Sequence, residues 1–376
     1  MKIAILGTRG IPASYGGFET FAEQLSTRLV ARGHQVTVYC RRHNANYTSN
    51  EYRGVRLAIL PSFKHKYFDT ITHTLLSVFH VLGTGAEVIL ICNSANSLLA
   101  WIPRLFGKPT AVNVDGLERQ RKKWNWLGRS YFHLAEWFST FLPTEMITDA
   151  RAMQEYYEQH YGKRSTLIAY GAEADRTEEF TVPARFGFER DRYVLYVSRL
   201  EPENNALLVM RAFEQVATPL KLALVGGNPY DDSYLRELKK TTDPRIILTG
   251  AVYGEGYQQL QSHAYCYVHA TEVGGTHPAL IEAMACARCV LFLDTKENRE
   301  VVADTGIPFT RSEADLVAKL RYVLDHPEVR EEYGQKALAR ALQHYHWDEI
   351  TSRYEELFER MLRSRRARGQ LSSGGT

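Results

Sequence analysis

The chain has 376 residues and an almost balanced charge, with 46 Lys and Arg against 43 Asp and Glu. At roughly 100–200 residues per domain, this length predicts about two domains and excludes a single small module. Apolar residues make up 44% and charged residues 24%, a composition that is typical of soluble globular proteins and excludes wholesale disorder. The excess of +3 is too small to indicate a nucleic-acid partner.

The cysteines and the apolar runs exclude further classes of protein. Most of the five cysteines lie inside apolar runs, as reduced buried thiols do, which favours the cytosol. Cys286 and Cys289 form a lone C-x-x-C with no second pair to complete a zinc site, so no metal is predicted. No stretch approaches the roughly 20 apolar residues that span a bilayer. The sequence predicts a cytoplasmic protein that at most rests on a membrane.

The first half alternates strand and helix patterns. A short apolar strand at 3–6 leads through a glycine-rich turn to an amphipathic helix at 18–31, which stops before Gly33. A second strand at 35–40 completes a βαβ unit of a doubly wound sheet. Further strands are predicted at 88–92, 110–114, 146–148 and 165–169.

The pattern restarts after a charged, proline-marked stretch at 177–191. Two Rossmann-like doubly wound α/β domains are predicted, facing each other across an interdomain cleft where such sheets bind ligands. We place the first domain at 1–180 and the second at 181–346, with a terminal helix at 347–364 that packs back on the first domain and a disordered tail at 365–376. The strands expected in the second domain are 193–197, 220–225, 245–249, 265–269 and 290–293, and its helices include 206–216 and 278–285.

The first glycine-rich turn suits a phosphate group. Gly7, Gly10, Gly16 and Gly17 lie between a strand and a helix, where backbone N–H groups can approach an anion. The spacing is not G-x-G-x-x-G, and residues 39–43 offer no carboxylate for a ribose, which argues against a nicotinamide cofactor. The alternative is that these glycines only form a tight turn.

Two loops of the second domain could carry chemistry. Arg199 follows the strand at 193–197, where a guanidinium can neutralise a diphosphate through a forked pair of hydrogen bonds. Its alternative role is an ion pair with Glu201 or Glu203. Gly274 and Gly275 precede the helix at 278–285, so their N–H groups can face an oxyanion. Glu282 could accept hydrogen bonds from a ribose, or it could be an ordinary solvated glutamate.

Five segments, in order over nearly the whole chain, resemble the retaining family 4 glycosyltransferases of GT-B fold, and most closely their bacterial rhamnosyltransferase-like branch in polysaccharide and O-antigen assembly. The resemblance implies metal-independent transfer of a sugar from a nucleotide diphosphate donor, with no cofactor besides this co-substrate. No Asp-x-Asp stands at a strand end, and Asp231-Asp232 is typical of a helix start. The segments are GTRGIPASYGGFE (7–19), NVDGLERQRKKW (113–124), IAYGAE (168–173), VSRLEPENN (197–205) and EVGGTHPALIEAMA (272–285).

The resemblance also implies roles for individual residues. Gly16 and Gly17 would approach the donor diphosphate from the first domain and Arg199 from the second, while Glu282 would hold the ribose. Negative charge on the departing phosphate would be stabilised by Arg199 and the loop amides. The remaining donor-binding residues would be Gly274, Gly275 and Thr276 at the phosphates and sugar, with Val252 and Tyr253 beside the nucleobase.

Three positions depart from the pattern of the family. Asp115 stands where many relatives use a His that orients the donor sugar, which fits a 6-deoxy sugar such as rhamnose from dTDP- or UDP-rhamnose, although Asp115-Gly116 could be only a turn. Glu272 is displaced by two residues from the usual first glutamate of the motif, and we take it as the donor-sugar carboxylate. Asn204 replaces a usual Lys, so Arg199 could share its load with Arg9.

The segment 119–137 mixes cations with tryptophans, a pattern typical of the surface of anionic membranes. The alternative is a solvated helix whose tryptophans pack inward. The membrane interpretation predicts a lipid-linked saccharide acceptor and a peripheral position on the inner face of the plasma membrane. Two other functions stay open: a nucleotide-sugar epimerase on the same scaffold, and a non-catalytic nucleotide-sugar-binding subunit of an assembly complex.

Overall fold

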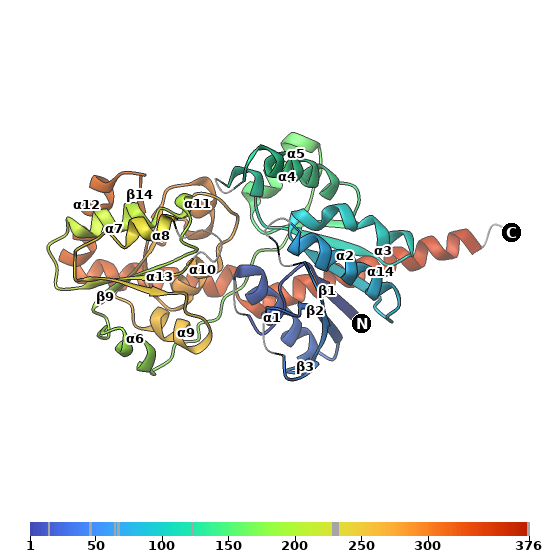
Figure 1. Cartoon of the computed structure of the whole chain (residues 1–376), viewed down its shortest axis with the longest axis horizontal. Helices are drawn as coiled ribbons and strands as arrows, with labels where there is room; N and C mark the ends of the chain where they lie inside the picture. Colours follow the sequence, from blue (N-terminus) through green and yellow to red (C-terminus); the bar gives the residue numbers. More distant parts are fainter. Residues whose placement is uncertain are drawn as a thin grey trace. The chain divides into compact units, whose positions relative to one another are not determined.

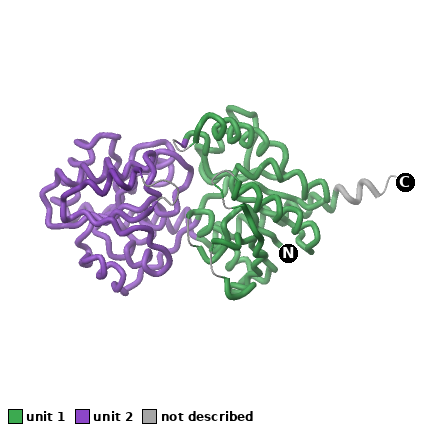
Figure 2. The backbone as a smooth tube through the Cα atoms, viewed as in Figure 1, with its two compact units in different colours: residues 1–120, 124–170, 347–376 green, residues 121–123, 171–346 purple. Residues whose placement is uncertain are grey.

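The computed structural model describes residues 1–13, 16–44, 47–63, 65, 68–121, 124–227 and 233–373, with side chains up to residue 367. The chain divides into two compact units (Figure 2). Unit 1 comprises Met1–Gln120, Trp124–Tyr170 and Trp347–Thr376, and unit 2 comprises Arg121–Lys123 and Gly171–His346. The division therefore falls at Tyr170/Gly171, ten residues before the boundary expected at 180/181.

Unit 1 is built on a sheet whose described strands run in the order β3-β4-β2-β1-β5-β6-β7-β8. All neighbours pair in parallel except β3 and β4, which are antiparallel. Its strands are β1 (Lys2–Leu6), β2 (Gln35–Arg41), β3 (Glu51–Tyr52), β4 (Val55–Leu60), β5 (Val88–Cys92), β6 (Thr110–Val114), β7 (Glu145–Thr148) and β8 (Thr166–Leu167). Its helices are α1 (Gly17–Ala31), α2 (Asp69–Leu82), η1 (Ser94–Leu99), α3 (Trp101–Leu105), η2 (Glu118–Gln120), α4 (Trp126–Ser139), α5 (Arg151–Tyr161) and α14 (Trp347–Ser373).

The centre of this sheet consists of continuous apolar strands. Every residue of β5 and β6 is buried, because helices cover both faces of a parallel sheet. Phe21, Leu25 and Leu29 of α1 recur at helical spacing and are fully buried. The predicted βαβ opening is confirmed, with α1 one residue longer at its start than expected.

The last helix belongs to unit 1. Tyr354 of α14 is fully buried, its hydroxyl accepts a hydrogen bond from Asn113 Nδ2 at 2.8 Å, and its ring lies 5.3 Å from that of Phe21. The prediction of a disordered tail was wrong for residues 365–373, because α14 continues to Ser373. Residues 365–373 contain no proline, and their single glycine, Gly369, lowers helix propensity without ending the helix.

Unit 2 has a parallel sheet whose described strands run in the order β11-β10-β9-β12-β13-β14. Figure 1 shows its helices on both sides of the strands, with α7 and α12 together. Its strands are β9 (Tyr193–Val197), β10 (Lys221–Val225), β11 (Ile246–Gly250), β12 (Cys266–His269), β13 (Cys289–Leu293) and β14 (Ile307–Phe309). Its helices are α6 (Thr181–Arg185), η3 (Pro202–Asn204), α7 (Ala206–Glu214), α8 (Ser233–Leu238), α9 (Gly254–Ser262), α10 (Pro278–Ala285), α11 (Lys296–Val302), α12 (Glu313–Asp325) and α13 (Pro327–His344).

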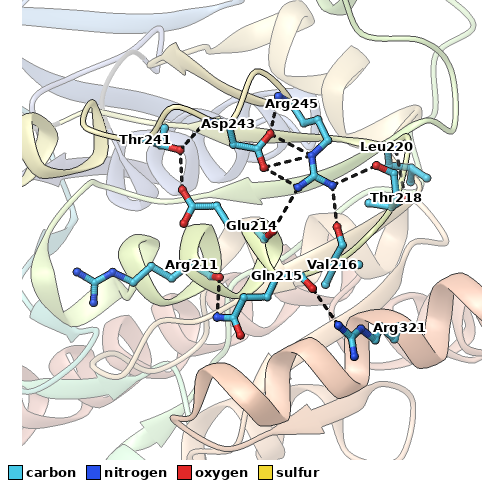
Figure 3. A network of polar contacts seen from close by, with 10 residues as sticks. All are labelled: Arg211, Glu214, Gln215, Val216, Thr218, Leu220, Thr241, Asp243, Arg245 and Arg321. Carbon is cyan, nitrogen blue, oxygen red and sulfur yellow. Dashed lines mark hydrogen bonds and ion pairs between the residues drawn. The ribbon is translucent and has the colours of Figure 1, made fainter.

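A polar network centred on Arg245 fixes the start of β11 (Figure 3). The guanidinium of Arg245 donates to the carbonyl oxygens of Val216 and Thr218, at 2.7 and 3.1 Å, and pairs with Asp243 at 2.5 Å. The hydrogen bond from Arg245 lowers the pKa of Asp243. This network ties the segment after α7 to the amino end of β11, so its role is structural.

Candidate active site

Two loops of unit 2 meet at one edge of its sheet. β9 and β12 are parallel neighbours in which Leu195 pairs with Tyr267, so the loops that follow them leave from the same edge. The backbone N–H of Glu272 donates to Glu203 O at 3.0 Å, and Asn205 Nδ2 donates to Ala270 O at 2.9 Å. The two segments predicted to carry chemistry, around Arg199 and around Gly274, are therefore joined directly by hydrogen bonds.

Arg199 lies in the loop after β9 with about a third of its side chain exposed (32%). Its guanidinium is 3.9 Å from Glu201 Oε2, which is the ion pair considered as the alternative. An ion pair at this distance on a partly exposed side chain is weak. Arg199 therefore pairs weakly with Glu201, and its positive charge stays accessible to solvent at the edge of the sheet.

Gly226 at the end of β10 holds this loop in place. Its φ is +147°, and a Cβ atom there would lie 1.8 Å from the carbonyl oxygen of Ser198. Any larger residue would push away the backbone that carries Arg199. Ser198 N–H donates to Val225 O at 3.1 Å, which continues the β9–β10 ladder up to the loop.

The glycine turn after β12 is compact. Gly275 and Thr276 are buried, and the turn leads into α10, whose first residue is Pro278. Proline at the first helical position leaves no N–H to satisfy. The N–H groups of Leu280 and Ile281 donate to His277 O at 3.0 and 3.2 Å, so the donor left for an anion in the first turn is the N–H of Ala279.

Glu282 lies in the second turn of α10 and is partly exposed. Its Oε2 accepts a hydrogen bond from the Tyr257 hydroxyl at 2.6 Å, and Gln261 Nε2 donates to the same hydroxyl at 2.8 Å. Burial raises the pKa of Glu282, and the hydrogen bond from Tyr257 lowers it in part. Glu282 is therefore an oriented acceptor rather than an ordinary solvated glutamate.

Tyr257 and Gln261 were not selected from the sequence. They lie one turn apart on α9. Their spacing of four residues, which places them on the same face of a helix, was the only feature of the sequence that could have indicated them. Val252 and Tyr253 precede α9: Tyr253 is its N-cap and is exposed, and Val252 is partly exposed. Both residues follow the end of β11, and their place beside the nucleobase stays a prediction.

Asn204 and Glu272 are engaged within the loops. Asn204 is buried, and its Nδ2 donates to the carbonyl oxygen of Arg199 at 2.6 Å. The carboxylate of Glu272 accepts from Asn205 Nδ2 at 2.8 Å and pairs with Arg311 at 2.9 Å. A role for Glu272 at the donor sugar stays a prediction, and the structure shows that this carboxylate also has an arginine partner.

The remaining predicted site residues belong to unit 1. Gly16 is the N-cap of α1, and Gly17 is its first residue. The backbone N–H of Arg9 donates to Glu19 Oε1 at 2.8 Å, so this buried glutamate fixes the first glycine turn. Asp115 follows β6 directly and is partly exposed, and the next residue, Gly116, has φ +156°.

The described residues contain no group of three His, Cys, Asp or Glu side chains that could hold a metal ion. Asp231 and Asp232 lie outside the described residues, so their predicted place at a helix start stays a prediction. All five cysteines are buried and form no disulfide. Metal-independent action stays a prediction.

Comparison with known proteins identifies the domain that carries these loops. Residues 191–326 match the family described as Glycosyl transferases group 1. The chain therefore carries a group 1 glycosyltransferase domain. This domain contains Arg199, the glycine turn and Glu282. Residues 1–173 match a family described as Domain of unknown function (DUF1972).

Two curated relatives share part of the sequence with the chain. An N-acetylgalactosamine-N,N'-diacetylbacillosaminyl-diphospho-undecaprenol 4-alpha-N-acetylgalactosaminyltransferase of Campylobacter jejuni is 26% identical over 40% of this chain and 42% of its own length. A lipopolysaccharide 1,2-N-acetylglucosaminetransferase of Salmonella typhimurium is 24% identical over 65% of this chain and 70% of its own length. The match thus spans less than half of the first relative.

Solved structures resemble the chain over nearly its whole length. Sucrose-phosphate synthase from Thermosynechococcus elongatus has a TM-score of 0.83 at 18% identity, covering 96% of this chain and 99% of that chain. Anabaena HepE in complex with UDP-glucose has a TM-score of 0.78 at 16% identity, with the same coverage. This likeness confirms the fold class expected for the group 1 glycosyltransferase domain and its partner unit, namely the α/β GT-B type.

Proposed function

We propose that this protein transfers a sugar from a nucleotide diphosphate donor to a hydroxyl of a saccharide in the assembly of bacterial surface polysaccharide. The observation that carries this proposal is the hydrogen-bonded pair of loops after β9 and β12, which contain Arg199 and the glycine turn at one sheet edge of a group 1 glycosyltransferase domain. The two curated relatives are both named for sugar transfer, which supports it.

Electrostatic stabilisation is the main catalytic effect in this proposal. When the bond between the anomeric carbon and the diphosphate breaks, negative charge collects on the departing phosphate. The guanidinium of Arg199 and the N–H groups of the glycine turn stabilise this charge, and such preorganised donors are often the largest catalytic contribution. By resemblance to the family, the reaction retains the anomeric configuration and uses no metal, and the leaving phosphate takes the proton of the acceptor hydroxyl.

The donor sugar is the least constrained part of the proposal. Asp115 in place of a histidine favours L-rhamnose from dTDP- or UDP-rhamnose, whereas the two curated relatives are named for N-acetylgalactosamine and N-acetylglucosamine transfer. A panel of dTDP-rhamnose, UDP-rhamnose, UDP-GalNAc and UDP-GlcNAc, scored by thermal stabilisation of the purified protein, tests the choice, because a ligand that binds the native state raises its apparent stability. Stabilisation by an N-acetylhexosamine donor alone would contradict rhamnose.

Two other functions are separated by their products. An epimerase would convert the donor to a new nucleotide sugar when no acceptor is present. A non-catalytic binding subunit would bind the donor without releasing a nucleoside diphosphate when acceptor membranes are added. The proposed transferase requires the acceptor and releases one nucleoside diphosphate for each sugar transferred.

An exposed apolar face of unit 1 supports action at a membrane. α2 contacts α3, and both α2 and α4 contact η1, so these helices form one layer of the unit (Figure 1). Trp126 is 72% exposed and Trp137 is 47% exposed, so the alternative in which the tryptophans of 119–137 pack inward is wrong for these two. We use the name α2–α4 face for the exposed large apolar side chains of these helices and the residues that follow them: Leu75, Leu76, Phe79, Leu98, Trp101, Leu105, Phe106, Trp126, Leu127, Leu134, Trp137 and Phe141.

The charge around the α2–α4 face fits an anionic bilayer. Arg104 and Arg129 are exposed beside the apolar side chains, whereas the acidic residues Asp69, Glu118 and Glu136 are buried. Lys122 and Lys123 lie outside the described residues. No helix in the described part of the chain is long and apolar enough to cross a membrane. We therefore propose peripheral binding to the inner leaflet, where a lipid-linked acceptor would be presented.

We expect the purified protein to co-float with vesicles that contain phosphatidylglycerol and to bind pure phosphatidylcholine vesicles more weakly, with binding reduced by salt. The double variant Leu105→Ser/Phe106→Ser should bind at least about tenfold more weakly, because it removes two exposed apolar side chains from the membrane contact. Tyr322→Ser, at an exposed aromatic residue of unit 2, is the matched control and should bind normally. Equal flotation of both variants would contradict a membrane role for this face.

A further inference from the structure

The diphosphate site of unit 2 has one cation fewer than the family pattern. The related enzymes often carry a Lys at the position of Asn204, and this neutral side chain is turned towards the backbone, where its Nδ2 donates to Arg199 O at 2.6 Å. Asn204 therefore fixes the loop that carries Arg199 and adds no charge. A positive charge that replaces this Lys would come from another residue on the same edge of the sheet.

His277 lies at that edge, in the segment that follows β12. It is the N-cap of α10, directly after the glycine turn, and its side chain is partly exposed. A Cβ atom on Gly274 would lie 2.4 Å from Cε1 and 2.9 Å from Nε2 of His277, so the imidazole lies directly against the glycine turn. Gly274, with φ +151°, is therefore required partly because this ring covers it.

A second histidine supports the ring of His277 from behind. The ring centroids of His269 and His277 are 4.9 Å apart. His269 is buried, with its Nδ1 3.4 Å from the Tyr267 hydroxyl, and its Nε2 has no hydrogen-bond partner among the described residues. The two rings are tilted by 47°, and this contact restricts the rotation of His277 and keeps its imidazole beside Gly274.

The charged groups around His277 decide its protonation. Burial lowers the pKa of His277 well below its usual value, and His269, Arg121 and Arg199 lower it further. Glu201 lies 3.6 Å from Arg121 and 3.9 Å from Arg199, and both arginines belong to unit 2. The other titratable groups nearby are already engaged: Glu272 with Arg311, and Glu282 with Tyr257.

We propose, building on the proposed function, that His277 is a donor-binding residue that takes up a proton from solvent when the nucleotide diphosphate binds and then donates a hydrogen bond to a phosphate oxygen. The imidazolium thus adds a positive charge to those of Arg199 and Arg121, in place of the one that Asn204 lacks. Arg199 contributes a permanent charge, and His277 contributes one that exists only in the complex. The free site avoids three adjacent cations, because Arg121 and Arg199 face a neutral ring.

The proton uptake follows from electrostatics. In the free protein His277 is neutral at pH 7. A diphosphate diester brings two negative charges beside the ring, and an opposite charge favours the protonated form of a histidine. At pH values between the low pKa of His277 in the free protein and its higher pKa in the complex, nucleotide binding is accompanied by proton uptake. Affinity is therefore greatest at the acidic end of this range and declines as the pH rises towards the pKa of the complex, by up to about tenfold for each pH unit.

Isothermal titration calorimetry in two buffers of different ionisation enthalpy measures this uptake directly. UDP-glucose and dTDP-rhamnose are suitable probes, because the diphosphate of a nucleotide sugar has no group that titrates near neutral pH. We expect the wild type to take up a substantial fraction of one proton per site at pH 7, and His277→Gln to take up almost none. His326→Gln, at an exposed histidine of unit 2, is the matched control and should behave as the wild type.

The pH dependence of affinity separates a binding role from a structural one. The affinity of the wild type should fall between pH 6 and pH 8.5, whereas that of His277→Gln should be lower at pH 6 and almost constant. Binding by the wild type without proton uptake, or an unchanged pH dependence in His277→Gln, would overturn the proposal for His277 alone. Absence of any nucleotide-sugar binding by the wild type would overturn it together with the proposed function.

Discussion

Arg199→Ala should reduce turnover by about 10²–10³-fold, which corresponds to the roughly 3–4 kcal/mol lost when one preorganised donor to a developing oxyanion is removed. The expected loss is large because the guanidinium acts on charge that appears as the leaving phosphate departs. The thermal unfolding midpoint should change little, since the side chain is partly exposed and its ion pair with Glu201 spans 3.9 Å. Release of nucleoside diphosphate in the presence of acceptor membranes measures the turnover.

Two further variants show whether charge or geometry matters. Arg199→Lys keeps the charge but loses the fork of donors, so it should recover only part of the activity. Arg211→Ala removes an exposed arginine of α7 that is paired with Glu313 at 3.8 Å, and it should leave turnover unchanged. Full activity in Arg199→Ala would contradict the assignment of Arg199 to the leaving phosphate.

Glu282→Ala should weaken nucleotide binding by roughly 10–150-fold, since hydrogen bonds to a charged group contribute about 1.5–3 kcal/mol. The carboxylate is held by the Tyr257 hydroxyl at 2.6 Å, so it is oriented before a ribose arrives. Because burial raises the pKa of Glu282, binding should fall as the pH drops through this raised pKa. Calorimetric titration with UDP-glucose or dTDP-rhamnose gives the affinities.

Variants around Glu282 separate its charge from its support. Glu282→Gln retains an acceptor without charge and should bind nucleotide with intermediate affinity and without the loss at low pH. Tyr257→Phe removes the supporting hydroxyl and should have a smaller effect than Glu282→Ala. Glu328→Gln, at an exposed glutamate of unit 2, is the matched control. Unchanged affinity in Glu282→Ala would contradict a place for Glu282 at the ribose.

The regular parts of the fold could be predicted because buried parallel strands are short apolar runs between helical patterns. β9 is found at the residues predicted for it, and β5 and β6 are as well. Strands that lack this pattern could not be found: β3 and β14 have only two and three residues and lie at sheet edges. The helix α14 extends beyond the predicted end at residue 364. The low apolar content of the residues after 364 indicates that they do not pack in a core, but it does not by itself end a helix.

The candidate site could be predicted only where a residue type and a strand end coincided. Arg199, the glycine turn and Glu282 follow or precede recognisable strands and helices, so their placement at one edge was foreseeable. His277 was missed because a single histidine before a proline carries no pattern, and its importance depends on contacts with Gly274 and His269. The exposure of the apolar side chains of α2 and α3 was not predicted. Whether an apolar side chain is buried or exposed depends on tertiary packing, and the residue type alone does not show it.

The most direct test of the account is the stoichiometry of turnover with a labelled nucleotide sugar. Wild-type protein incubated with donor and acceptor membranes should release one nucleoside diphosphate for each sugar that enters the lipid fraction, and Arg199→Ala should release almost none. Without acceptor, the donor should be recovered unchanged. Tight donor binding with no release in the presence of acceptor, or an epimerised donor in its absence, would contradict sugar transfer at the edge formed by the loops after β9 and β12.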